Sequence, residues 1–123
     1  MLAVRLLNIQ LHKADYENLE MISYIKLAVE LQNKGNKAIS GVKGIATFKD
    51  KFGDTVGELP IKVEEEISAG KTITVDLQKR YNQFSDEDQK LASLNAATTQ
   101  FSISPEVILF ADGSKFEALK VAQ

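Results

Sequence analysis

The sequence predicts an all-β fold: an immunoglobulin-like antiparallel β-sandwich of about seven to eight strands with one short helical crossover. Apolar and polar residues alternate in several short segments, as in strands that bury one face. Two of these segments run into Asp/Gly turns at residues 50–54 and 112–113, which are typical of antiparallel hairpins. One segment alone has helical spacing, whereas a parallel sheet would need a crossover helix between each pair of strands. A partly open barrel is the alternative architecture.

Three strands are predicted in the first half of the chain. Residues 4–12 alternate, with Leu7, Ile9 and Leu11 on one face, and the polar residues 14–20 are expected to be irregular. The clearest strand follows and ends in a turn over residues 33–37; its core-facing residues are Ile25, Leu27, Val29 and Leu31. Residues 39–49 form the third strand, where Gly41 and Gly44 indicate a bulge or a close approach of another backbone.

The fourth strand is predicted over residues 55–67, interrupted by Pro60. Proline has no N–H to donate, so this strand is expected at a sheet edge. Glu64, Glu65 and Glu66 are interpreted as charges on that edge that block pairing with other sheets, rather than as an acidic binding patch. A turn at residues 68–70 leads into a strand over residues 72–77.

The one predicted helix begins after Ser85, which is expected to be its N-cap, with Asp88 three residues later. Leu91 and Leu94 lie on one helical face, and the helix is expected to end near Asn95. Residues 99–104, 106–111 and 115–121 supply two or three more strands. In the last hairpin, Asp112–Gly113 predicts a type I′ turn with positive φ at Gly113.

Composition bounds the class of protein. A chain of 123 residues fits a single domain over residues 1–123, and 44% hydrophobic residues are enough for a folded core. The net charge of −2 lacks the strongly basic surface that nucleic-acid binding needs. The apolar runs are too short to span a bilayer. Without cysteine, neither a disulfide nor a thiolate metal site can form.

No motif in the sequence predicts an enzyme or a cofactor. His12 is the only histidine and lies at a polar position of a strand, and no Gly-x-Ser-x-Gly elbow or phosphate-binding loop is present. Calcium is the metal that the acidic residues would suit best, because six acids lie in or beside loops: Asp50, Asp54, Asp86, Glu87, Asp88 and Asp112. Turn and helix-start preferences explain these acids, so no catalytic, cofactor or metal residue is assigned.

The segment of residues 79–84 is the candidate interaction surface. Lys79, Arg80, Tyr81 and Phe84 combine two basic and two aromatic side chains, and Arg and aromatic residues are common at binding hot spots. The alternative, which the sequence favours, is that Tyr81 and Phe84 fold inward and anchor the helix to the sandwich.

Residues 25–54 resemble the FxLYD-type domains and related immunoglobulin-like modules of bacterial envelope proteins. The matching positions are Val29, Asn33, Ile39, Phe48, Asp50 and Gly53, with Ala69-Gly70-Lys71 similar to a later turn. Phe48-Lys49-Asp50 stands where the family has Leu-Tyr-Asp, and the helix near residues 85–94 is not a general family feature. The resemblance implies a non-enzymatic module that is secreted or lipid-anchored.

The expected function is therefore a non-catalytic protein-interaction or assembly module of the bacterial cell envelope. The expected location is periplasmic or extracellular, with an export signal or lipid anchor in the precursor. Residues 1–5 lack the basic and apolar regions of a signal peptide, which leaves the cytoplasm as the alternative. The alternative function is a small-ligand or calcium-binding sandwich. The sequence does not identify the protein partner, and no nucleic-acid partner is expected.

Overall fold

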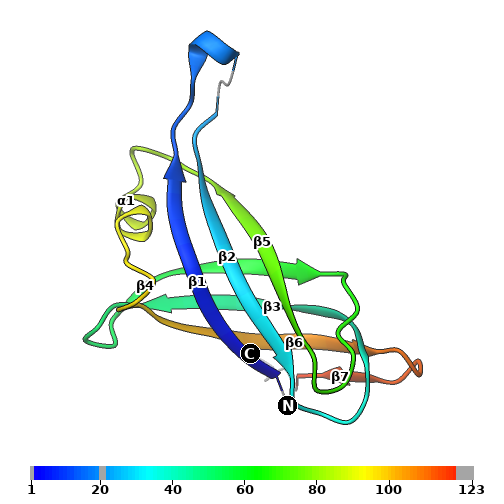
Figure 1. Cartoon of the computed structure of the whole chain (residues 1–123). Helices are drawn as coiled ribbons and strands as arrows, with labels where there is room; N and C mark the ends of the chain where they lie inside the picture. The colour runs from blue at the N-terminus through cyan, green and yellow to red at the C-terminus, as the bar shows by residue number, and fades with distance from the viewer. Residues whose placement is uncertain (1, 20–21, 119–123) are drawn as a thin grey trace, which may run out of the picture.

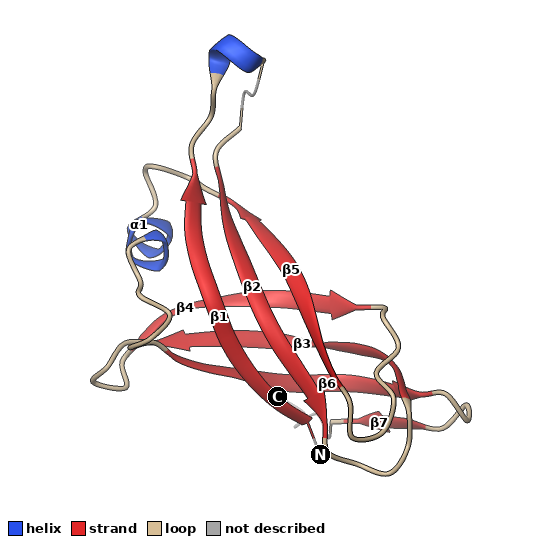
Figure 2. Cartoon of the chain, in the orientation of Figure 1, coloured by secondary structure: helices blue, strands red, loops and turns tan. Residues whose placement is uncertain are grey.

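The computed structural model describes residues 2–19 and 22–118, and it contains two antiparallel sheets packed face to face (Figure 1). The first sheet has three strands in the order β1 (Leu2–His12), β2 (Tyr24–Asn33) and β5 (Thr72–Arg80). The second has four in the order β4 (Thr55–Val63), β3 (Ile39–Lys49), β6 (Gln100–Phe110) and β7 (Lys115–Glu117). The helices are the short 3-10 turn η1 (Tyr16–Asn18) and α1 (Asp86–Ala92), as Figure 2 shows.

The strand order confirms the predicted immunoglobulin-like sandwich. Strands β1, β2 and β5 take the places of strands A, B and E of that fold, and β3, β6 and β7 those of C, F and G. Strand β4 pairs with β3 at the edge of the second sheet. Helix α1 carries the chain from β5 in the first sheet to β6 in the second, which is the predicted helical crossover.

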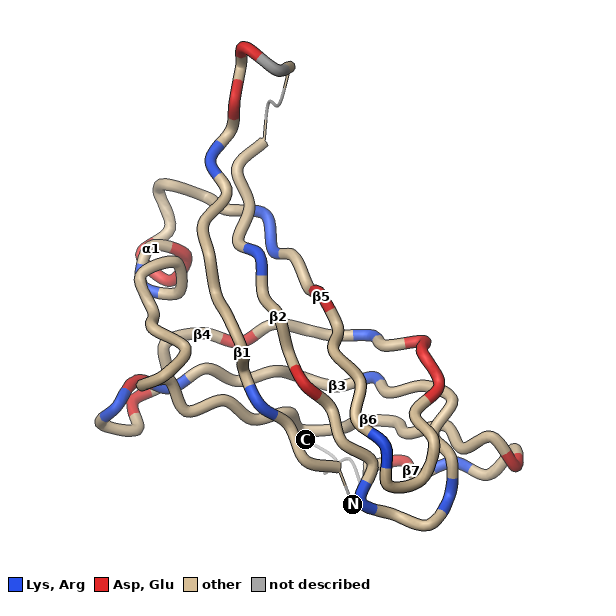
Figure 3. The backbone as a smooth tube through the Cα atoms, in the orientation of Figure 1, with Lys and Arg blue, Asp and Glu red and all other residues tan. Residues whose placement is uncertain are grey.

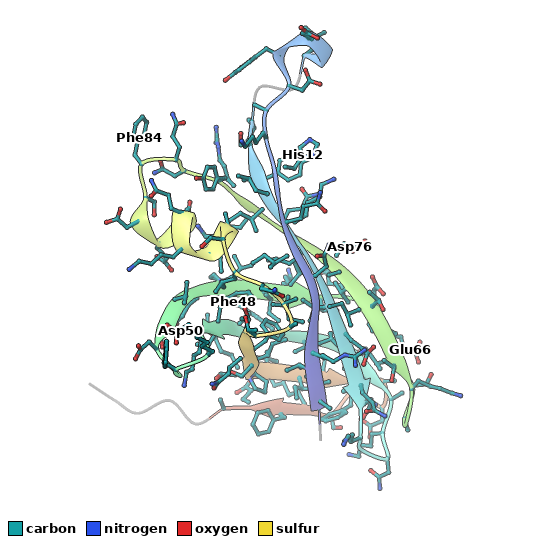
Figure 4. All side chains as sticks on the ribbon, turned by 60° about the vertical axis from the view of Figure 1, so that its left-hand side comes forward. His12, Phe48, Asp50, Glu66, Asp76 and Phe84 are labelled. Carbon is teal, nitrogen blue, oxygen red and sulfur yellow. The ribbon has the colours of Figure 1, made fainter. Side chains whose placement is uncertain are left out.

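Alternating apolar side chains form the core between the sheets. Every predicted core residue of β2 is buried: Ile25, Leu27, Val29 and Leu31. Phe48 of β3 is fully buried as well and packs against the ring of Phe101, with 5.1 Å between ring centroids; Figure 4 shows Phe48 inside the sandwich. Such burial contributes about 1.5–3 kcal/mol per large apolar side chain.

The first strand is present, but its predicted inward face is wrong at one position. The pairing of β1 with β2 shifts between Leu6 and Asn8, so Leu7 is an extra residue in a bulge. Leu6 is buried instead, and Leu7 is exposed. A bulge places two consecutive residues opposite one partner residue and so interrupts strict alternation.

The predicted edge position of Pro60 is confirmed, although the strand does not break there. Strand β4 lies at the edge of its sheet, and Pro60 pairs with Ile45. The strand ends at Val63, so the interpretation of residues 64–66 as a charged edge strand is wrong. These glutamates lie in the exposed connection that leads from β4 to β5 in the other sheet. Directly after them, Ile67 forms an isolated bridge with Ile39.

The glycines of β3 have the predicted effects. The pairing of β3 with β6 shifts near Gly41 and again near Gly44. A Cβ on Gly44 would lie 2.4 Å from the carbonyl oxygen of Ser104, so only glycine fits this close approach. The two predicted segments 99–104 and 106–111 are one strand, β6, because its second irregularity is a bulge rather than a break.

The two Asp/Gly hairpins share one turn type, which is not the predicted type I′. Gly113 has a positive φ of 90° as expected, but Asp112 does not. The amide of Gly113 donates to the carbonyl of Phe110 at 3.0 Å, and Gly53 donates to Asp50 at the same distance. Each hairpin is therefore a three-residue loop that ends in a left-handed glycine.

Hydrogen bonds from the Ser114 hydroxyl and amide lower the pKa of Asp112 to about 2.

Replacing Gly113 by Val is expected to destabilise the domain by more than about 1 kcal/mol, because a β-branched residue is strained at positive φ. Ala111→Val, in the same exposed turn at an ordinary φ, is the control. Thermal unfolding of both variants measures the difference. Equal melting temperatures would show that the turn tolerates a side chain at position 113.

Candidate protein-interaction surface

The connection between β5 and α1 is fixed by the carboxylate of Asp88. This side chain is 5% exposed and forms an ion pair with Lys79 Nζ. Its second oxygen accepts a hydrogen bond from the Asn82 amide at 2.8 Å. The Asp88 amide in turn donates to the Ser85 hydroxyl at 3.2 Å, which confirms Ser85 as the N-cap. Lys79 therefore has a structural role in holding this connection.

Tyr81 and Phe84 point in different directions. The Tyr81 amide donates to the Ser23 carbonyl at 3.0 Å, and its ring packs against the core. Phe84 is 86% exposed, and in Figure 4 it points away from the sandwich. The expectation that both aromatics fold inward is correct for Tyr81 and wrong for Phe84. Two local hydrogen bonds explain this, since the Phe84 amide donates to Asn82 Oδ1 at 3.0 Å and the Ser85 amide to the Asn82 carbonyl at 3.0 Å.

The connection between β1 and β2 extends beyond both sheets at the same end of the molecule (Figure 1). Its two arms are tied together where the Ala14 amide donates to Ser23 Oγ at 2.8 Å. Tyr16, Leu19 and Ile22 are exposed along it. The prediction that residues 14–20 are irregular is confirmed over residues 14–19, apart from the single turn η1, while residue 20 lies outside the described residues.

A surface groove of about 440 Å³ separates the two connections. One wall contains Ala14, Tyr16, Ile22 and Ser23, and the other contains residues 80–84. Three of the four predicted surface residues, Arg80, Tyr81 and Phe84, thus line one feature, which we call the end groove. Lys79 is held by Asp88 and is not part of its lining.

Figure 3 shows acidic residues at the tip of the β1–β2 connection and basic residues where β5 ends. Arg80 is the one charged residue in the lining, and it has no ion pair among residues 2–19 and 22–118. Asp15 and Glu17 are on the β1–β2 connection but not in the lining, and Asp15 Oδ1 accepts a hydrogen bond from the Glu17 amide. His12 stacks on Tyr24 at 4.8 Å and is outside the lining.

Four of the six loop acids, Asp50, Glu87, Asp88 and Asp112, have side chains engaged in local structure. Asp50 Oδ1 accepts hydrogen bonds from the amides of Phe52 and Asp54 at 2.9 and 3.0 Å. Asp112 binds Lys37 at 3.3 Å, and Glu87 accepts from the Glu58 amide. Within the described part of the chain, no group of three or more His, Cys, Asp or Glu residues is placed to hold a metal ion.

Sequence reasoning did not identify the opposite wall of the end groove. Tyr16 lies in the segment 14–20 that the sequence predicts only to be irregular, and Ile22 lies outside every predicted element. The available signal was the presence of large apolar residues in a segment without strand or helix periodicity. Such residues have no core face to join, so exposure at a long connection was predictable in principle.

Comparison with known proteins supports the fold alone. No protein-family model matches the sequence, and no curated protein matches it. A similar solved structure is Northeast Structural Genomics Consortium target SoR45, with a TM-score of 0.51 and 11% sequence identity. The similarity covers 95% of this chain and 80% of that chain. In the described residues no helix has both the length and the apolar character needed to cross a membrane. The chain thus has the architecture of an all-β sandwich, and a solved structure has a similar fold.

Proposed function

We propose that this chain is a non-catalytic protein-interaction or assembly module of the bacterial cell envelope, and that the end groove is its docking site. The observation that carries the proposal is the exposed ring of Phe84 on a loop fixed by hydrogen bonds. A free aromatic ring exposed to water offers apolar area to a partner. Because the loop is already ordered, binding costs little additional conformational entropy.

The composition of the end groove favours a protein partner. Tyr16, Phe84 and Arg80 belong to the residue types that are enriched at binding hot spots. The groove lies between two connections at one end of the sandwich, and connections held on a rigid scaffold commonly carry binding residues. Ile22 and Tyr81 add apolar surface to its walls.

The envelope location rests on sequence features. Residues 25–54 resemble FxLYD-type envelope modules, whereas the absence of cysteine suits the periplasm and the cytosol equally. From this resemblance we infer a periplasmic or extracellular site of action.

Capture of partners from an envelope extract tests the proposal. Phe84→Ser removes the exposed ring without touching the core, and Phe52→Ser is the matched control, since Phe52 is 79% exposed in a turn elsewhere. We expect the parent and Phe52→Ser to retain the same partner and Phe84→Ser to lose at least about tenfold in affinity, as for a hot-spot aromatic. Equal capture by all three would exclude the end groove, and partners found solely in a cytosolic extract would contradict the envelope location.

A further inference from the structure

We propose that the end groove binds an extended peptide segment in which an acidic side chain lies next to an apolar or aromatic one. This inference rests on the proposed function and specifies the chemistry of the partner. The occupant is a segment of another protein, and its acidic side chain pairs with Arg80. Three features carry this assignment: the charge of the groove, the side-chain donors in its walls, and the acids on the β1–β2 connection outside its lining.

The charge of the lining is opposite in sign to that of the whole chain. The chain has a net charge of −2, whereas Arg80 is the one charged residue among those lining the groove. Its guanidinium has no ion pair within the described residues and only donates hydrogen bonds. A partner carboxylate can therefore form two parallel hydrogen bonds with it without displacing an existing partner.

Two polar side chains of the groove wall keep hydrogen-bond donors that the internal hydrogen bonds do not use. Asn82 Oδ1 accepts from the Phe84 amide, and the NH₂ of the same side chain can donate to a partner. Ser23 Oγ already accepts from the Ala14 amide and keeps its hydroxyl hydrogen to donate. The Gln83 carbonyl accepts from the Gln89 side chain. Donors that surround one cation fit an acidic, acceptor-rich segment.

The apolar part of the segment has a place beside this polar site. Tyr16, Ile22 and Phe84 border the groove, and an aromatic or aliphatic side chain of the partner can be covered by them. Asp15 and Glu17 belong to the β1–β2 connection and are not among the residues that line the groove. Their charge repels an acidic group near that connection, and it also opposes docking of this apolar end on an anionic membrane.

Panning a random linear peptide library against the domain tests this inference. We expect the parent to enrich sequences with Asp or Glu next to an aromatic or aliphatic residue. Arg80→Glu should enrich Lys or Arg at that position instead, and it should bind the parent's peptides at least about tenfold more weakly, since a charge-assisted pair is lost and a repulsion added. Lys71→Glu makes the same charge change at an exposed turn outside the groove and should behave as the parent.

The outcomes separate this inference from the proposed function. Enrichment without an acidic preference, lost in Phe84→Ser, would overturn the peptide chemistry and keep the end groove as a docking site. No enriched sequence at all would overturn the inference, while capture of a folded envelope protein by the same domain would still support the function. Binding to phosphatidylglycerol vesicles that Phe84→Ser abolishes, with no peptide enriched, would assign the groove to a membrane and overturn it as well.

Discussion

A charged side chain at position 29 is expected to prevent this domain from folding. Val29 lies in the middle of β2, the central strand of its sheet, pairs with Leu6 and Val75, and is 1% exposed. Val29→Asp would remove about 1.5–3 kcal/mol of apolar burial and place an unpaired carboxyl group among aliphatic side chains. The combined cost, more than about 4 kcal/mol, is comparable with the whole stability of a small domain.

Lys26→Asp is the matched control, because it introduces the same residue on the same strand at an exposed position. Its expected change in the free energy of unfolding is within about 1 kcal/mol, as for most surface substitutions. Circular dichroism and urea denaturation compare the two variants with the parent. A soluble Val29→Asp domain with an unchanged unfolding midpoint would show that β2 does not occupy the core.

The sequence predicted the strands best where period-two alternation is strong. The buried residues of β2 were all identified, because one face of that strand is apolar at every second position. Alternation failed at Leu7, where a bulge adds one residue to β1. Nothing in the local sequence marks that bulge, since the register depends on the partner strand.

Turn chemistry was predictable in part. The need for glycine at position 113 follows from the Asp–Gly pair, but the loop length decides the turn type. The structure places Ala111 in the loop as well, which gives three residues instead of two. The length of that loop depends on where β6 and β7 stop pairing, a tertiary property.

The candidate surface also combines features that the local sequence predicts with features that depend on tertiary structure. Residue type identified Arg80 and Phe84 as candidate surface residues. It did not predict that Phe84 is exposed, because the backbone conformation decides whether an aromatic residue before a helix packs inward or points outward. The hydrogen bond from the Phe84 amide to Asn82 Oδ1 decides this direction. Tyr16 and Ile22 join the groove only because the β1–β2 connection extends past the sheets. This is a three-dimensional relation between segments about sixty residues apart in the chain.

Removing the carboxylate of Asp88 is expected to destabilise the domain by about 2–3 kcal/mol and to disorganise the end groove at the same time. Asp88→Ala leaves the Lys79 ammonium and the Asn82 amide without their acceptor. Loss of one partner of a fully buried pair costs about 3–5 kcal/mol. The cost expected for Asp88→Ala is lower, about 2–3 kcal/mol, because the Lys79 side chain is 25% exposed and its ammonium group can be hydrated.

Asp86→Ala is the control for Asp88→Ala, because it removes a carboxylate from the first turn of the same helix at an exposed position. Hydrogen exchange distinguishes a local from a general effect. The amide of Asn82 should lose its protection in Asp88→Ala, and capture of the envelope partner should weaken although Phe84 is intact. If exchange at Asn82 and partner capture both match those of Asp86→Ala, the loop is held by other contacts and Asp88 does not organise the groove. If stability falls while capture stays at the parental level, Phe84 binds without a preformed loop, and the low entropic cost argued for this site is wrong.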